Sequence, residues 1–220
     1  MILYQLVRGL IQIVARLYWR ATFEGLHNVP ASGAFVLAPV HRSIIDFGLV
    51  SGVTRRRMRY MGKEELWSWR PLGWFISTLG AFPVHRGAAD RDALHRCLEE
   101  LQAGEPVVLF PEGARRSGPV VENLFEGASY VASRAGVPVV PVAIAGSEQA
   151  LPKGSRLPRP VRVHVVVGPP IAPAPLPEGR RHPSRRAVKE LTAGLEAELQ
   201  RLLDSADSRL GVNHRGRSAV

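Results

Sequence analysis

The sequence has little cysteine and lacks the short signatures of several common enzyme classes. Cys97 is the one cysteine among 220 residues, which excludes an internal disulfide and a multi-cysteine zinc site. The chain contains no Gly-x-Ser-x-Gly nucleophile elbow, no Gly-x4-Gly-Lys phosphate loop and no His-Glu-x2-His zinc motif. Serine-hydrolase, nucleotide and zinc chemistry therefore lack their usual signatures, and we expect a reducing compartment and no metal.

Long uninterrupted apolar runs are also missing. The N-terminal stretch is strongly apolar, but Arg8 and Arg16 interrupt it, and no small-residue cleavage site of a signal peptide follows. A membrane-spanning helix needs about 20 apolar residues, and a central cation costs about 2.5–3.5 kcal/mol on insertion scales. We therefore expect residues 1–24 to form an amphipathic helix in the membrane interface. The alternative is a helix packed on its own domain with an exposed polar edge.

The charge of the chain is strongly one-sided. A net charge of +10 predicts attraction to polyanions, which include nucleic acid, anionic lipid headgroups and phosphorylated substrates. A nucleic-acid-binding protein should interleave basic and aromatic residues in a recognisable module, and none is present. We therefore expect no nucleic-acid partner, and we expect a lipid surface or a phosphorylated substrate instead.

Apolar runs rich in β-branched residues alternate with helical patterns along the middle of the chain. The expected strands are Ala34–Val40, Arg59–Gly62, Ala81–His85, Val107–Phe110, Val137–Ile144 and Val161–Gly168. The expected helices are Ile44–Val53, Glu64–Leu79, Arg91–Ala103, Asn123–Ala135 and Ser184–Leu203. This alternation predicts a single α/β domain over residues 25–205, with a largely parallel central sheet flanked by helices. We expect residues 206–220 to be a disordered polar tail.

The stretch "VHRSIIDF" places a histidine directly after an expected strand. In α/β sheets, functional groups collect where the carboxyl ends of strands meet loops. Asp46 can reach His41 if the histidine sits in the turn that leads into the helix. A carboxylate on one ring nitrogen leaves the other nitrogen as an acceptor, which is the arrangement of a general base. A purely structural histidine remains the alternative.

The stretch "LFPEGARRSG" brings further charges to the same sheet edge. Glu112 and Arg115 follow a buried strand, so we expect them near His41. Arginine guanidinium groups suit a phosphate dianion, and a carboxylate can accept a hydrogen bond from a substrate hydroxyl. The combination indicates a site for a phosphorylated substrate.

These motifs resemble those of the glycerolipid acyltransferase family, most of all its bacterial 1-acyl-glycerol-3-phosphate acyltransferases. The family's histidine and aspartate, with four residues between them, match His41 and Asp46, and its Phe-Pro-Glu-Gly block with a following basic residue matches residues 110–115. The block "GAFPVHRG" points to Arg86, and "MGKEEL" points to Lys63. The order of the blocks holds over roughly two thirds of the chain.

Three positions depart from the family pattern. Val40 stands where the family often has asparagine, His85 where it commonly has an acid, and Ala114 where it commonly has threonine. These changes touch the residues around the reacting pair, so they bear on the choice of acceptor more than on the type of reaction.

The resemblance implies transfer of a fatty acyl group from acyl-CoA or acyl-carrier protein to lysophosphatidic acid, giving phosphatidic acid without a cofactor. In this interpretation His41 is the base and Asp46 orients it. The substrate would be bound by Lys63, Arg86, Glu112, Gly113 and Arg115. The resemblance also implies a peripheral location on the cytoplasmic face of an anionic membrane. Acylation of glycerol 3-phosphate or of another lysophospholipid, and a non-catalytic lipid-binding relative, are the alternatives.

Overall fold

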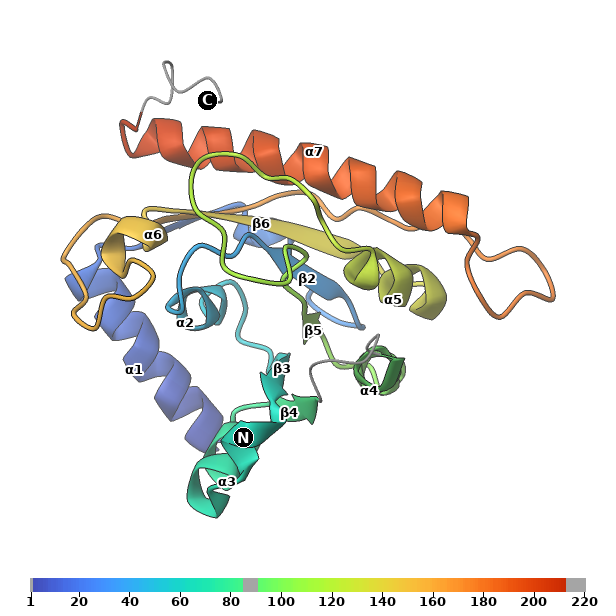
Figure 1. Ribbon diagram of the computed structural model, residues 1–220, viewed down its shortest axis with the longest axis horizontal. Helices are drawn as coiled ribbons and strands as arrows, with labels where there is room; N and C mark the ends of the chain where they lie inside the picture. The colour runs from blue at the N-terminus through green and yellow to red at the C-terminus, as the bar shows by residue number, and fades with distance from the viewer. Residues whose placement is uncertain (1, 85–90, 213–220) are drawn as a thin grey trace.

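The computed structural model describes residues 2–84 and 91–212, which form a seven-stranded sheet with helices on both faces (Figure 1). The strand order is β1-β7-β6-β2-β5-β3-β4, and the hydrogen-bonded neighbours are parallel except for β6 and β7. The strands are β1 (Thr22–Glu24), β2 (Val36–Pro39), β3 (Arg59–Lys63), β4 (Ala81–Val84), β5 (Val107–Val108), β6 (Val139–Ala145) and β7 (His164–Val167). The predicted α/β fold with a largely parallel sheet is confirmed.

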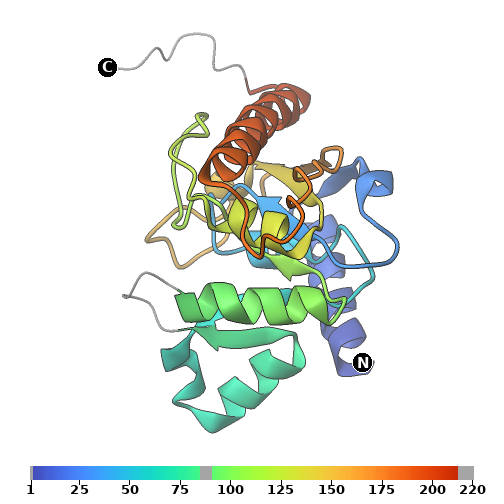
Figure 2. The same ribbon diagram turned by 90° about the vertical axis from the view of Figure 1, so that its right-hand side faces the viewer.

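The helices divide between the two faces of the sheet. They are α1 (Ile2–Tyr18), α2 (Asp46–Val50), α3 (Arg70–Thr78), α4 (Arg91–Gln102), α5 (Gly127–Ala135), α6 (Ser147–Ala150) and α7 (Arg185–Arg209), with 3-10 turns at Leu26–Asn28 and Glu64–Trp67. Helix α7 packs on β6, β7 and α5, and α5 packs on α4. Helices α1 and α2 contact each other on the opposite side of the sheet (Figures 1 and 2).

The centre of the sheet is buried on both faces. Every residue of β2 and of β6 is buried, and the two strands pair in parallel with Val36 opposite Val139. Strands covered on both faces read as continuous apolar runs and show no alternation of apolar and polar residues. This is why "FVLAPV" and "VPVVPVAI" identify the centre of the sheet from the sequence.

Helix α1 turns its polar residues toward the domain and many of its apolar residues outward. The Gln5 side chain donates to the carbonyl of Arg55 at 2.9 Å, and Arg8 Nε donates to the carbonyls of Ser51 and Thr54 at 2.8 and 2.9 Å. Its exposed apolar residues include Ile2, Leu6, Leu10, Ile13, Val14, Leu17 and Tyr18. The helix packs on its own domain, as the alternative to an interfacial helix predicted. That alternative left the polar edge of the helix exposed to solvent, whereas in the structure the polar edge contacts the domain.

Two predicted helices start or continue differently in the structure. Glu64–Leu79 is split into a 3-10 turn and α3, because Trp69 is extended (φ −94°, ψ 103°) and a proline opens the helix that follows. Helix α5 begins at Gly127 and not at Asn123, whose φ of 57° is left-handed. In both cases one residue, Trp69 or Asn123, has a backbone conformation that is not α-helical.

The two ends of the chain also differ from prediction. Residues 22–24, assigned to the N-terminal helix, form the edge strand β1, because α1 ends at Tyr18 and Arg20 adopts a positive φ of 47°. The predicted start of the disordered tail, residue 206, is too early, because α7 continues to Arg209 and Ala206 is fully buried. Residues 213–220 lie outside the described residues, as does His85 at the end of the predicted strand 81–85.

Gly25, which follows β1, tests the packing between the ends of β1 and β7. Its φ is +73°, and a Cβ there would overlap the carbonyl oxygen of Val167, whereas Gly104 has a φ of +83° and no atom within 4 Å of an added Cβ. Left-handed backbone costs a non-glycine residue roughly 1–2 kcal/mol. We expect Gly104→Ala to lower the free energy of unfolding by that amount and Gly25→Ala by roughly 3 kcal/mol or more. Urea denaturation measures both, and equal losses would contradict the packing described here.

Candidate active site

His41 and Asp46 meet where β2 leads into α2. His41 lies in the turn after the strand, Asp46 is the first residue of the helix, and the ring Nδ1 is 3.0 Å from Asp46 Oδ2. The histidine is 8% exposed and the aspartate is fully buried. An ionised carboxylate only accepts hydrogen bonds, so Nδ1 carries the proton and Nε2 of the neutral ring is left as an acceptor. The sequence expectation that the turn brings the two together is met.

The same oxygen of Asp46 also holds the turn itself. The backbone N–H groups of Arg42 and Ser43 each donate to Oδ2 at 2.7 Å. The Ser43 hydroxyl donates in turn to the carbonyl of Leu151 at 2.8 Å. The aspartate therefore fixes the backbone on which the histidine sits, as well as the orientation of the ring.

Aromatic side chains flank the histidine ring. The ring of Phe110 lies 4.2 Å from that of His41, centroid to centroid, and the ring of Phe47 lies 5.4 Å away in an edge-on arrangement. These rings limit the positions that the imidazole can adopt and leave it in an apolar setting. In such a setting electrostatic interactions at the ring are stronger than in water.

Glu112 approaches His41 from the neighbouring strand β5. It is fully buried; Oε2 accepts the backbone N–H of His41 at 2.6 Å, and Oε1 accepts Nη1 of Arg42 at 2.5 Å. The resemblance implies that this carboxylate binds the substrate, but in the structure it faces protein groups and is closed to solvent. Gly113, the next residue, has a φ of +66° and lines the adjoining cavity.

A cavity of about 800 Å³ opens in front of His41. Apolar and aromatic side chains form much of its wall, and Arg115 lies on it as predicted. Lys153, from the loop after α6, lines the same cavity and was not identified from the sequence. The signal that could have found it is topological: β6 neighbours β2 in parallel, so the segment that follows β6 reaches the edge that carries His41.

A second, more apolar cavity of about 460 Å³ lies between α1 and β3. It shares Ile44, Phe47 and Met61 with the first cavity, so the two adjoin beside the histidine. The hydroxyl of Tyr60, on its wall, has no hydrogen-bond partner within the described part of the chain, and burial raises the pKa of this phenol. The phenol is therefore neutral at physiological pH.

Two of the predicted cations cannot be placed in the site. Lys63 ends β3, but its side chain lies outside what the structure describes, and Arg86 falls in the segment 85–90 that is also outside it.

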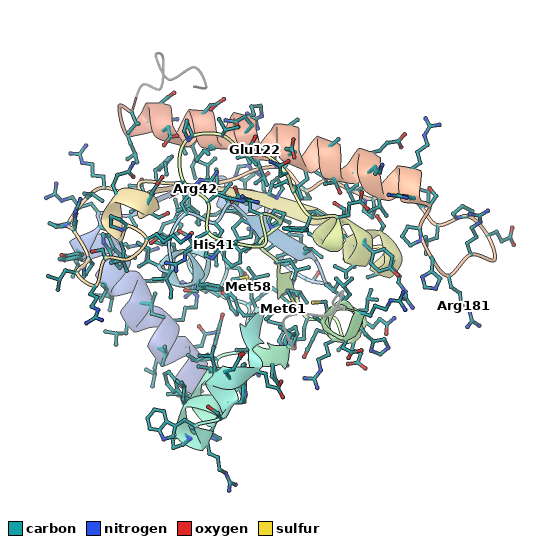
Figure 3. The ribbon with its side chains drawn as sticks, viewed as in Figure 1. His41, Arg42, Met58, Met61, Glu122 and Arg181 are labelled. Carbon is teal, nitrogen blue, oxygen red and sulfur yellow. The ribbon has the colours of Figure 1, made fainter. Side chains whose placement is uncertain are left out.

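Within residues 2–84 and 91–212, no three His, Cys, Asp or Glu side chains are grouped as ligands for a metal ion. Cys97 is buried on α4. Figure 3 shows His41 and Arg42 near the middle of the molecule, between β2 and α2.

Comparisons with known proteins identify relatives of the chain. A 1-acyl-sn-glycerol-3-phosphate acyltransferase of Bacillus subtilis is 26% identical over 206 residues, 93% of this chain and 99% of that one. A chloroplastic 1-acyl-sn-glycerol-3-phosphate acyltransferase of Arabidopsis thaliana is 30% identical over 141 residues, 63% of this chain and 39% of that one. The chain spans about two fifths of the length of the plant relatives it matches.

A solved structure shares the fold. The crystal structure of the 1-acyl-sn-glycerophosphate acyltransferase PlsC from Thermotoga maritima superposes with a TM-score of 0.70 at 24% identity, over 99% of this chain and 83% of that one. The model of the family described as Acyltransferase matches residues 20–145, which contain His41, Asp46 and Glu112. This match covers more than half of the sequence, and the chain belongs to the acyltransferase family.

Proposed function

We propose that the protein transfers a fatty acyl group from an acyl thioester to the free hydroxyl of 1-acyl-glycerol-3-phosphate, forming phosphatidic acid in phospholipid biosynthesis. The observation that carries this proposal is that His41, hydrogen-bonded to the buried Asp46, lines a cavity that combines apolar side chains with Arg115 and Lys153. A lysophosphatidic acid needs both features, because it has an acyl chain and a phosphate. The relatives named as 1-acyl-sn-glycerol-3-phosphate acyltransferases support the same acceptor.

The chemistry requires one base and no covalent enzyme intermediate. His41 Nε2 takes the proton of the acceptor hydroxyl as its oxygen attacks the thioester carbonyl. Asp46, hydrogen-bonded to Nδ1, stabilises the imidazolium that forms. The tetrahedral intermediate then collapses: the C–S bond breaks, the new ester remains, and the thiolate takes the proton back from the imidazolium. The reaction needs no cofactor beyond the thioester substrate.

The two adjoining cavities suit the two acyl chains. The 460 Å³ cavity beside α1 is lined mainly by apolar residues and meets the larger cavity at Phe47 and Met61, close to His41. An acyl chain in this space would carry its thioester carbonyl toward the histidine. We propose acyl-CoA as the donor, with acyl-carrier protein as the alternative.

The phosphate of the acceptor is assigned to the cations of the larger cavity. Arg115 and Lys153 line it, and a guanidinium with an ammonium can neutralise a phosphate dianion. Lys63 and Arg86 remain proposed ligands on the family resemblance. Glycerol 3-phosphate or another lysophospholipid is the alternative acceptor, since either would place a polar group against the same cations.

We further propose that α1 places the enzyme on the cytoplasmic surface of an anionic membrane. None of the helices in the described part of the chain has both the length and the apolar character needed to cross a bilayer. The exposed apolar side of α1, the exposed Trp69 just before α3 and the exposed Trp74 within α3 provide apolar surface, and residues of α1 and α3 line the same 460 Å³ cavity. Tryptophan is enriched at membrane–water interfaces.

Substitution of the proposed base tests the reaction. We expect His41→Ala to lower acceptor-dependent thiol release from palmitoyl-CoA by about 10²–10⁴-fold, because general-base catalysis contributes that much. His95→Ala is the control, since His95 is a surface residue of α4 whose side chain is 67% exposed. The assay is run with 1-acyl-glycerol-3-phosphate in detergent. Absence of release with CoA and carrier-protein donors alike would favour the non-catalytic lipid-binding alternative.

Substitution of the cavity cations tests the acceptor. We expect Arg115→Met and Lys153→Met each to raise KM for 1-acyl-glycerol-3-phosphate by roughly tenfold, because a charge-assisted hydrogen bond contributes about 1.5–3 kcal/mol. The turnover number should change little. Lys189→Met, on the exposed side of α7, is the control and should leave KM unchanged. An equal effect in the control, or a fall in kcat alone, would remove these cations from the phosphate site.

Substitution on the outer side of α1 tests membrane binding. We expect the triple variant Leu6→Gln, Leu10→Gln and Leu17→Gln to lower binding to phosphatidylglycerol-containing vesicles by at least about tenfold, because burying each leucine is worth about 1.5–3 kcal/mol. Leu157→Gln, at a residue 78% exposed elsewhere on the surface, is the control. Sedimentation with the vesicles measures binding and circular dichroism checks the fold. Unchanged sedimentation would exclude α1 as the membrane-binding element.

A further inference from the structure

A buried ion pair lies directly behind the proposed base. Arg42 follows His41 in the chain, and its Nη1 donates to Glu112 Oε1 at 2.5 Å. The side chains of Arg42 and Glu112 are 3% and 0% exposed. Removing two charges from water carries a large desolvation penalty, which their mutual attraction offsets only when the geometry is good and further hydrogen bonds are made. Those further bonds show what the pair holds in place.

Glu112 directs its second oxygen at the backbone of the base. Oε2 accepts the N–H of His41 at 2.6 Å, so the carboxylate bridges the histidine backbone and the arginine side chain. Strands β2 and β5 pair in parallel, and Glu112 follows β5 as His41 follows β2. The carboxylate therefore joins the two loops that leave the sheet at neighbouring strand ends.

The carbonyl of His41 is held as well. It accepts the backbone N–H of Arg116 at 2.8 Å and lies 3.5 Å from Nη1 of Arg42. Nη2 of Arg42 donates to the carbonyl of Val120 at 3.1 Å, which ties the far end of the same loop to the base. Together with Asp46 on the ring, these contacts constrain the histidine at its backbone N–H, its backbone carbonyl and its imidazole.

We propose that Glu112 and Arg42 are positioning residues for His41, and that Glu112 does not bind the acceptor. The inference rests on the proposed function and deepens it, because it reassigns the carboxylate that the family resemblance gives to the substrate. Glu112 is closed to solvent and makes its two contacts with protein groups, while the cations that line the cavity remain available to the phosphate. Displacement of a reacting group by 1 Å can lower a rate by about 10²-fold.

Glu112→Gln separates the two roles. A glutamine has one acceptor oxygen where the carboxylate serves two donors, so one of the contacts to His41 and Arg42 must be lost. We expect kcat to fall about 10–100-fold while KM for 1-acyl-glycerol-3-phosphate stays within about twofold. Arg115→Met is the matched comparison with the opposite signature, a raised KM. A raised KM with unchanged kcat in Glu112→Gln would overturn the proposal, and so would no change in either constant.

A second variant covers the case in which a lone charge prevents folding. Replacing a buried ion pair by apolar side chains of similar size is often neutral for stability. We expect Arg42→Met/Glu112→Met to fold, to lose at least as much kcat as Glu112→Gln, and to keep KM. A double variant that retains wild-type kcat would contradict a positioning role for the pair.

A measurement without substrate separates this inference from the proposed reaction. The ring ¹⁵N resonances of His41, assigned by their loss in His41→Ala, report its tautomer and its hydrogen bonds. We expect Glu112→Gln to shift those resonances, while Arg115→Met leaves them unchanged. This result would support the positioning role even if the wild type transferred no acyl group, and unchanged resonances would overturn it.

Discussion

One carboxylate oxygen of Asp46 accepts three hydrogen bonds, and the rest of the site depends on it. The backbone N–H groups of Arg42 and Ser43 form the turn around this oxygen, and the imidazole of His41 completes it. A histidine and an aspartate five positions apart would not share a face of one continuous helix. The turn ends β2 and begins α2 so that both side chains reach the same point. The same carboxylate oxygen therefore fixes both the backbone of the turn and the orientation of the His41 ring.

Much of the fold could be read from the sequence because buried parallel strands leave an unmistakable pattern. The continuous apolar runs at β2 and β6 are the centre of the sheet, and polar residues in the loops that follow β2 and β5 are at the centre of the site. Strand β1 was missed because three residues at a sheet edge, with Phe23 half-buried between two exposed neighbours, carry little periodicity. The extension of α7 was missed because Ala206 and Asp207 are buried by tertiary packing in a polar-looking segment.

The sequence predicted several residues of the site, but neither their contacts nor the remaining residues. The sequence places Glu112 beside His41, yet it does not tell which donors a carboxylate will meet, since both a substrate hydroxyl and an arginine suit it. Arg42 gave no signal because a charged residue between two polar ones reads as solvent-exposed. Lys153 lies in a loop without a motif, and only the pairing of β6 with β2 brings that loop to the cavity.

The docking of α1 has a consequence for the order of events during synthesis. Its polar side chains bind carbonyl groups at Ser51, Thr54 and Arg55, which are some forty to fifty residues further along the chain. These partners all follow α1 in the sequence, so the helix is synthesised before the segment on which its polar side docks. The polar side of α1 can therefore be satisfied only after residues 51–55 have been made, whereas its exposed apolar side depends on none of them.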